Sequence, residues 1–271
     1  MSVASNIIIV VQARMSSTRL PGKVMMPVLG KSLLARMTER LQQSGYPATV
    51  IVAIPDEVED DVIEREVMLL GLHCFRGNMN NLLDRHYQAA KAFNADVILK
   101  IPSDCPLIDP GVIDQSLDCF FLNDYDFVSN LHPATWPDGN DVEIMTMACL
   151  EKTWHEASLK LELEHTTPYI WENPEKFSIG NVEWATGLDY SMSHRFTIDY
   201  PEDYEFITRI YEELYPANPN FSCEDILQLL DNKPEIFDIN QKYAGVNWYR
   251  HHLNELKTIS AAQTKLAEEE I

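Results

Sequence analysis

The chain has 271 residues, which is enough for one large α/β domain or two small ones, and 45% of them are hydrophobic. Its net charge of -21 argues against DNA or RNA as a partner, because affinity for nucleic acids depends on basic residues that neutralise phosphates. No apolar run approaches the roughly 20 residues that a membrane helix needs. We therefore expect a globular protein that binds neither nucleic acid nor membrane.

The five cysteines form no Cys-x-x-Cys pair, and the short apolar stretch near the N-terminus has no basic flank of the kind that a signal peptide carries. A mean hydropathy of -0.21 is that of a water-soluble chain. These features predict a cytoplasmic protein with reduced thiols.

The first predicted element is a strand over residues 7–11, an unbroken β-branched run of the kind that is buried on both faces of a sheet. A loop follows, and Leu33, Leu34, Met37 and Leu41 then recur at helical spacing. Residues 1–38 contain five Lys or Arg and no acidic residue. The loop thus predicts a small anionic ligand at the carboxyl end of a first parallel strand, where open α/β sheets bind ligands. The alternative is a solvated basic loop.

Strands and helices then alternate. Residues 50–54, 73–76 and 97–101 are predicted strands, and the segments that begin near Asp56 and Asn80 are predicted helices, the first ending at Gly71 and the second near Asn94. This alternation predicts an α/β fold with a doubly wound, mostly parallel sheet. Asp109 and Pro110 predict the capped start of a further helix.

The second half of the chain is less regular. Predicted strands cover residues 126–130 and 141–147, and a predicted helix covers 161–171. Residues 195–199 predict another strand that ends in a carboxylate, followed by helices from Pro201 to about Tyr215 and from Ser222 to Leu230. From about residue 251 onward the chain is polar, and we expect a frayed helix or disorder there.

The loop after the first strand resembles the nucleotide-binding signature of the cytidylyltransferase family, which includes the CMP-sialic acid and CMP-KDO synthetases and the spore coat polysaccharide protein SpsF. The resemblance is closest to the SpsF branch. The residues that carry it are Gln12, Ala13, Arg14, Ser17, Arg19, Pro21, Gly22 and Lys23. It implies a Rossmann-like sheet of the nucleotide-diphospho-sugar transferase type.

The resemblance also implies a domain organisation. Residues 1–250 would form a single cytidylyltransferase-like domain, in which about 126–195 form the sugar pocket and an excursion that pairs two subunits of a homodimer. Residues 251–271 would form a polar tail.

The resemblance further implies a site for a triphosphate and a metal. Arg14 and Lys23 match the basic pair of the family, with Arg19 as a helper, and Ser103 lies beside the predicted metal ligand Asp104. Asp104 in Ser-Asp-Cys-Pro matches Gly-Asp-x-Pro, and Asp199 in Asp-Tyr-Pro-Glu-Asp matches Asp-x-Pro-Glu-Asp. We expect these two aspartates to hold Mg²⁺, provided that their strands are close in one sheet. The alternative for each aspartate is a turn or a helix cap.

The base and sugar contacts follow from the same resemblance. Arg76 and Gly77 stand where the family uses Arg-Gly-Ser to approach the nucleobase, with Asn78 in place of the serine. Asp84 and Arg85 match the SpsF branch, although we favour a purely helical role for them. For the sugar we expect contacts from Asp138, Asp141, Glu143, Glu164, His165 and Tyr169. Lone acids and histidines are also common as structural groups.

The function implied is the transfer of a cytidylyl group from CTP to a sugar, with an acidic sugar such as a nonulosonic acid as the expected substrate, for surface or spore coat polysaccharide. Arg14, Lys23 and Asp104 are the expected catalytic residues. A glycosyltransferase that uses a sugar nucleotide is the alternative enzyme, and a non-catalytic nucleotide-binding subunit is the alternative outside catalysis. The D-x-D form of metal-dependent glycosyltransferases occurs at residues 124–126, where we favour a turn that ends a helix.

Overall fold

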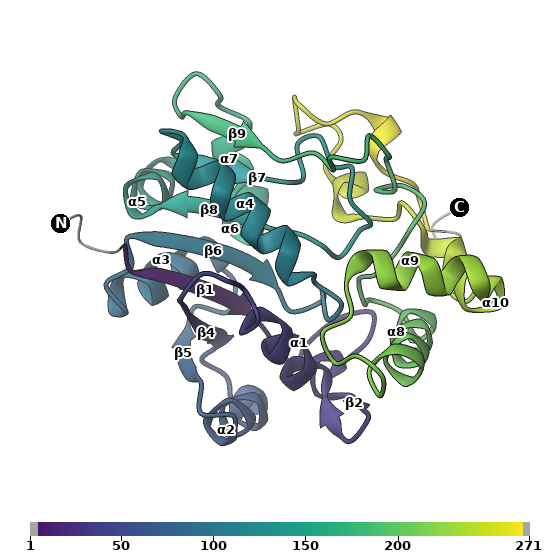
Figure 1. The fold of residues 1–271 in the computed structure, drawn as a ribbon. Coiled ribbons are helices and arrows are strands. Elements are labelled where there is room, and N and C mark those ends of the chain that lie inside the picture. The colour runs from purple at the N-terminus through teal and green to yellow at the C-terminus, as the bar shows by residue number, and fades with distance from the viewer. Residues whose placement is uncertain (1–4, 268–271) are drawn as a thin grey trace.

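The computed structural model describes residues 5–267. Its centre is a seven-stranded sheet in the order β5-β4-β1-β6-β8-β7-β9 (Figure 1). The four strands from β5 to β6 are parallel, whereas β8 runs antiparallel to both of its neighbours. The strands are β1 (Ile7–Gln12), β4 (Ala48–Pro55), β5 (His73–Gly77), β6 (Val97–Pro102), β7 (Phe127–Ser129), β8 (Glu143–Thr146) and β9 (Ile179–Asn181). The mostly parallel sheet that the sequence predicts is confirmed.

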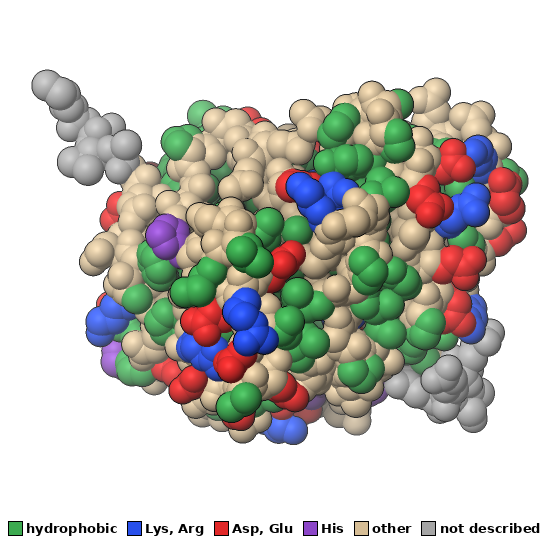
Figure 2. Space-filling view, turned by 90° about the horizontal axis from the view of Figure 1, so that it is seen from below, with side chains coloured by type: hydrophobic (Ala, Val, Ile, Leu, Met, Phe, Trp, Pro, Cys, Tyr) green, Lys and Arg blue, Asp and Glu red, His purple; other side chains and the backbone are tan. Residues whose placement is uncertain are grey.

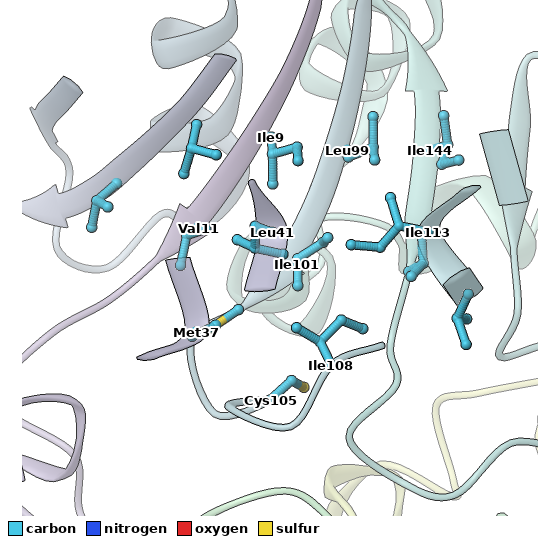
Figure 3. Packing of buried hydrophobic residues seen from close by; sticks show 14 of the residues in the cluster. Ile9, Val11, Met37, Leu41, Leu99, Ile101, Cys105, Ile108, Ile113 and Ile144 are labelled. Atoms are coloured by element: carbon cyan, nitrogen blue, oxygen red, sulfur yellow. The ribbon is translucent and has the colours of Figure 1, made fainter. Parts of the chain in front are cut away.

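Alternate residues of the strands face two helical layers, as a period of two requires. Ile9 and Leu99 point toward α1, α2 and α4, where they meet Met37, Leu41 and Ile113 (Figure 3). Their neighbours along each strand point toward α3, α5, α6 and α7. The bounds are α1 (Leu33–Leu41), α2 (Asp61–Leu69), α3 (Leu82–Ala92), α4 (Pro110–Leu122), α5 (Met147–Glu156), α6 (Lys160–His165) and α7 (Pro168–Trp171). The buried runs of β1 and β6 are therefore covered on both sides.

Side-chain caps fix where the helices begin. Asp109 accepts a hydrogen bond from the Gly111 amide (2.7 Å) ahead of Pro110 in α4, as predicted. Asn81 accepts from the Asp84 amide at the start of α3 (2.8 Å). The predicted helix over 161–171 is instead broken into α6 and α7, because Thr166 adopts a positive φ of 74° between them.

A third group of helices lies beside the carboxyl edge of the sheet. It consists of α8 (Pro201–Leu214), α9 (Cys223–Asn232) and α10 (Pro234–Phe237), which pack on a hairpin of β2 (Pro27–Val28) and β3 (Lys31–Ser32) and on the start of α1 (Figure 1). The strand predicted over 195–199 is wrong. This segment is an extended loop that makes one isolated bridge, between Arg195 and Asp138.

The C-terminal segment is ordered against the domain, so the prediction of a frayed or disordered tail from residue 251 is wrong as far as residue 267. Leu256 and Ile259 are buried in the hydrophobic core on the α3 and α5 side of the sheet. Two apolar side chains spaced three apart in a polar stretch were too weak a signal for a core element. Residues 268–271 lie outside the described part of the chain.

The surface seen from below in Figure 2 shows acidic and basic side chains next to one another in small groups. None of the helices among residues 5–267 has both the length and the apolar character needed to cross a bilayer. All five cysteines are free.

Candidate active site

A cavity of about 960 Å³ opens at the carboxyl ends of β1 and β6. Its walls come from segments that are far apart in the sequence. We call residues 12–24 and 79–85 the cationic side, and residues 130–143, 164–171 and 246–251 the aromatic side. Loops that leave the ends of neighbouring parallel strands meet at one edge of a sheet, which explains why the cavity forms there.

Lys23 lies where the two predicted metal ligands meet. It begins a 3₁₀ turn directly after Gly22, whose φ of 72° lets the chain reverse, and its side chain is almost fully buried. The ammonium donates to Asp199 Oδ1 (2.9 Å) and to the Ile198 carbonyl (2.6 Å), and lies 3.5 Å from Asp104 Oδ2. Burial alone would lower the pKa of Lys23, but the two carboxylates outweigh it and raise the pKa.

Asp104 and Asp199 converge without sharing a sheet, contrary to the condition set from the sequence. Asp104 follows β6, whereas Asp199 lies in the extended loop just before α8. The two loops are tied together at the Asp104 carbonyl, which accepts from the Ile198 amide and from the Thr197 hydroxyl (both 2.9 Å). Side-chain and backbone bonds between loops thus replace the strand pairing that was expected.

Arg195 was missed by the sequence analysis, although it holds this region together. Its guanidinium is 1% exposed and pairs with Asp203 (2.9 Å), Asp199 (3.2 Å) and Asp138 (3.3 Å). Burial would raise the pKa of Asp199, but Lys23, Arg19 and Arg195 together hold it well below its usual range. An arginine at the start of the run 195–199, four residues before the motif aspartate, was the available signal.

The other residues predicted to bind nucleotide divide into two sets. Gln12, Arg14, Arg19 and Ser103 line the cavity together with Lys23. Ala13 does not, because it is buried and its amide donates to the Ala53 carbonyl of β4 (3.1 Å). Arg19 pairs with Asp199 at 2.7 Å and therefore joins the group around Lys23.

Arg76 and Gly77 do not line the cavity, contrary to the prediction of nucleobase contact. The Arg76 guanidinium points toward the start of α2, where it pairs with Glu64 (2.7 Å), Asp61 (2.9 Å) and Asp56 (3.1 Å). The acidic residues at the start of α2 and just before it thus bind the Arg76 side chain, which the motif predicted to contact the nucleobase.

Arg85 lines the cavity instead, so its side chain lies beyond the helical face that we favoured for it. A Cβ on Gly77 would lie 3.0 Å from Arg85 Cγ, so the glycine leaves room for the Arg85 side chain. Asp84 does have a structural role, since it accepts from the Trp154 indole (2.9 Å). Asp126 of the D-x-D sequence lies outside the cavity, in the turn between α4 and β7, as predicted.

The aromatic side brings together most of the residues predicted to bind sugar. Asp138, Asp141, Glu143, Glu164 and His165 all line it. Glu143 is buried, forms an ion pair with Lys100 and accepts from the Thr167 hydroxyl (2.5 Å). Burial and the nearby Asp104 raise the pKa of Asp141 to about 6. Burial raises the pKa of Asp138 as well, although Arg195 opposes it.

Tyr169 is outside this wall, contrary to the prediction. Its hydroxyl donates to Glu156 of α5 (2.5 Å), and Trp171 lines the cavity in its place. The break between α6 and α7 changes the faces that a continuous helix would have presented. Residues 246–251 add Trp248, whose ring stacks on His165 at 3.8 Å between centroids.

Comparisons with known proteins place this geometry in a family. The family model for cytidylyltransferases matches residues 8–225. The chain belongs to the cytidylyltransferase family.

Two relatives of this cytidylyltransferase match it along most of their length, and a third matches over less than half. It is 34% identical to the uncharacterized protein MJ1063 of Methanocaldococcus jannaschii over 234 residues, which is 86% of this chain and 94% of that one. It is 30% identical to the spore coat polysaccharide biosynthesis protein SpsF of Bacillus subtilis, over 85% of this chain and 96% of that one. A 3-deoxy-manno-octulosonate cytidylyltransferase of Trichlorobacter lovleyi matches 43% of this chain and 46% of its own length, at 31% identity.

Solved structures agree with the fold. A cytidylyltransferase from Leptospira borgpetersenii superposes with a TM-score of 0.81 at 36% identity, over 86% of this chain and 97% of that one. A CMP:2-keto-3-deoxy-manno-octonic acid synthetase in complex with CTP superposes with a TM-score of 0.59 at 17% identity, over 78% and 100%, which shows the shared nucleotide-diphospho-sugar transferase fold.

Two sets of side chains in the cytidylyltransferase have the chemistry to hold a metal. Asp104 and Asp199 fit a divalent cation, because they already hold the Lys23 ammonium between them. Glu164, His165 and His252 place ligand atoms within 4.8 Å of one another at the aromatic side. The sequence analysis missed the second set because His252 is 87 residues away from His165.

Proposed function

We propose that the protein transfers the cytidylyl group of CTP to the anomeric hydroxyl of a sugar, giving a CMP-sugar and pyrophosphate. The observation that carries the proposal is that Lys23 joins Asp104 and Asp199 in a cavity that is also lined by further carboxylates and by aromatic rings. The family and the SpsF relative support it, and the name of SpsF suggests a product used for surface polysaccharide.

The carboxylates at the junction are assigned to the metal. Asp104 and Asp199 would hold Mg²⁺ together with phosphate oxygens, since Mg²⁺ typically takes one or two carboxylates plus substrate phosphates. When bound, the cation offsets the negative charge that develops on the reacting phosphates. Lys23 bridges the two aspartates in the structure. With the cation on those carboxylates, the Lys23 ammonium would face the leaving pyrophosphate, with Arg14 and Arg19 beside it.

The sugar is assigned to the aromatic side. Ring faces of Trp171 and Trp248 suit the apolar face of a pyranose, and Asp138, Asp141 and Glu143 are acceptors for its hydroxyls. In the reaction the anomeric oxygen forms a bond to the α-phosphorus, the bond from that phosphorus to the bridging oxygen breaks, and the hydroxyl proton passes to an acceptor. Asp138 and Asp141 are the carboxylates on this wall that could take that proton.

An acidic sugar is the proposed substrate class, because relatives over part of the chain are named 3-deoxy-manno-octulosonate cytidylyltransferases. Lys100 and Arg195 are the cations nearest to the carboxylates of the aromatic side, each of them already ion-paired. The substrate panel therefore needs acidic, neutral and amino sugars side by side.

The experiment is pyrophosphate release from CTP, Mg²⁺ and each sugar, with the CMP-sugar identified by mass spectrometry. Release that depends on both CTP and a sugar is the expected result. Transfer or hydrolysis of a sugar nucleotide without pyrophosphate would overturn the proposal in favour of a glycosyltransferase. Replacement of CTP by the other nucleoside triphosphates measures the base preference.

We also propose a homodimer that works in the cytoplasm, where CTP is available. The resemblance to the family supports the dimer, with residues 126–195 as its pairing region. Light scattering of the purified protein tests it, since a monomer at micromolar concentration would contradict the proposal.

A further inference from the structure

The cations that line the cavity differ in whether an acid already neutralises them. Lys23 and Arg19 pair with Asp199, Arg195 pairs with three aspartates, and Lys100 pairs with Glu143. Within residues 5–267, Arg14 and Arg85 form no ion pair. An unneutralised cation in a cavity is the place where an incoming anion gains most.

Arg85 is the less accessible of the two. Only 4% of the residue is exposed. It lies near the start of α3, and its side chain reaches the cavity. One terminal nitrogen donates to the Asn78 carbonyl (3.2 Å), whereas the buried Nε has no hydrogen-bond partner. A buried donor without a partner costs free energy that a ligand acceptor would recover.

Arg14 lies near enough to affect Arg85. Burial and, to a smaller extent, the charge of Arg14 lower the pKa of Arg85 to about 10, while Asp60 opposes both. Among the described residues Asp60 forms no ion pair with Arg85. Its Oδ1 accepts from the Met15 amide (2.7 Å), and its buried Oδ2 has no hydrogen-bond partner. Two like charges held together in a cavity repel each other until an anion binds between them.

We propose that Arg14 and Arg85 form a two-guanidinium site for the polyphosphate of the nucleotide. This inference rests on the proposed function for the identity of the ligand, and it assigns Arg85, on α3, to the phosphates in addition to the motif residues. Two planar guanidinium groups offer paired donors to phosphate oxygens, which an ammonium does not. Lys23, by contrast, is held by the two aspartates.

Calorimetric titration with inorganic tripolyphosphate in the presence of EDTA tests the site without base, sugar or metal. We expect the wild type to bind, and Arg85→Gln to bind about 10- to 100-fold more weakly, as for the loss of hydrogen bonds from a charged group. Arg85→Lys should recover only part of the affinity. Arg65→Gln removes an exposed charge from α2, outside the cavity, and should bind like the wild type.

Arg14→Gln covers the case in which Arg85→Gln does not fold, because Arg14 is exposed. It should weaken tripolyphosphate binding and raise the melting temperature of the ligand-free protein, since it removes the repulsion. The double variant should lose less binding free energy than the sum of the losses in the two single variants, because both residues contact one anion. Wild-type affinity in Arg85→Gln, or no binding to the wild type, would overturn the inference.

The two proposals fail separately. If CTP and a sugar release pyrophosphate while Arg85→Gln keeps its affinity for tripolyphosphate, the anion site is wrong and the proposed function stands. If the variants lose affinity but no sugar supports pyrophosphate release, the anion site stands and the proposed function is wrong.

Discussion

The two groups of cations in this cavity differ in whether an acidic side chain neutralises them. Lys23 and Arg19 come from the same loop as Arg14, yet they are neutralised by Asp199, which is 176 residues beyond Lys23 in the sequence. Arg14 and Arg85 have no such partner within the described chain. A motif therefore supplies the residue types, but the acids that fold back onto the loop decide which of its cations a ligand meets.

The two groups also differ in their hydrogen bonds: the neutralised group is cross-linked within the protein, whereas the unneutralised group retains a donor for a ligand. The neutralised group is tied by side-chain bonds between the loops that carry Lys23, Asp104 and Asp199, with Arg195 behind them. The unneutralised group carries repulsion and an unpartnered donor. Pre-arranged charges of this kind bind a ligand without reorganising first.

The largest effect is expected when the neutralised group is broken at its centre. Asp199→Asn removes the carboxylate that Lys23, Arg19 and Arg195 share, and should lower turnover by about a thousandfold, at the upper end for loss of one electrostatic group. Three cations are left short of one charge, so we also expect about 3 kcal/mol less stability. Steady-state kinetics and urea unfolding measure the two effects.

Asp189→Asn is the matched control for that variant. Asp189 also lines the cavity, but it is exposed and accepts bonds only from nearby Ser191. It should keep turnover within about twofold of the wild type, as surface substitutions usually do. Equal losses of turnover in both variants would mean that catalysis depends on negative charge anywhere in the cavity, and the contrast between the two groups of cations would be wrong.

A smaller effect is expected when Lys23 is removed and both aspartates are kept. Lys23→Ala should lower turnover by about a hundredfold, because a cation that faces the phosphates is lost. The affinity for Mn²⁺ without nucleotide should rise, because the ammonium no longer competes for Asp104 and Asp199. Electron paramagnetic resonance of free Mn²⁺ measures this affinity. Weaker Mn²⁺ binding would show that Lys23 supports the metal site and does not compete with it.

The aromatic side should respond through the sugar alone. Trp248→Ala removes the ring that stacks on His165 and should raise the KM for sugar by about tenfold or less, with the KM for CTP unchanged. Trp154→Ala, which disturbs a stack with Tyr87 away from the cavity, should affect stability without changing either KM. A rise in the KM for CTP in Trp248→Ala would show that the aromatic side also contributes to CTP binding, and the division of the cavity into two sides would be wrong.

The sequence predicts best where a signal is local. The apolar run of β1, the alternation up to β6, the cap at Asp109 and the start of a helix at Ser222 need only neighbouring residues to be recognised, and all are confirmed. That Asp104 and Asp199 meet was predicted by motif, but the reason given for their meeting was wrong, because loop bonds to the Asp104 carbonyl replace a strand. Such bonds have no periodicity in the sequence.

The side chains that were misplaced have long-range partners. Gly77 leaves room for Arg85 to reach the cavity, and Trp248 arrives from a stretch near the end of the predicted domain that no motif singled out. Tyr169 turns away because a positive φ at Thr166 breaks the expected helix. Each outcome depends on tertiary packing, which patterns within one segment do not encode.

The smallest effect is expected at the residue on which motif and structure disagree most. Arg76→Gln should change the KM for CTP by less than about twofold, because Arg76 lies outside the cavity and its guanidinium is already held by three acids of α2 and the loop before it. Partly exposed ion pairs contribute little, so we expect a loss of stability of about 1 kcal/mol or less. The KM for CTP and for UTP, measured beside Arg85→Gln, gives the comparison. A rise above tenfold for CTP alone would return Arg76 to the nucleobase and would mean that it leaves α2 when the nucleotide binds.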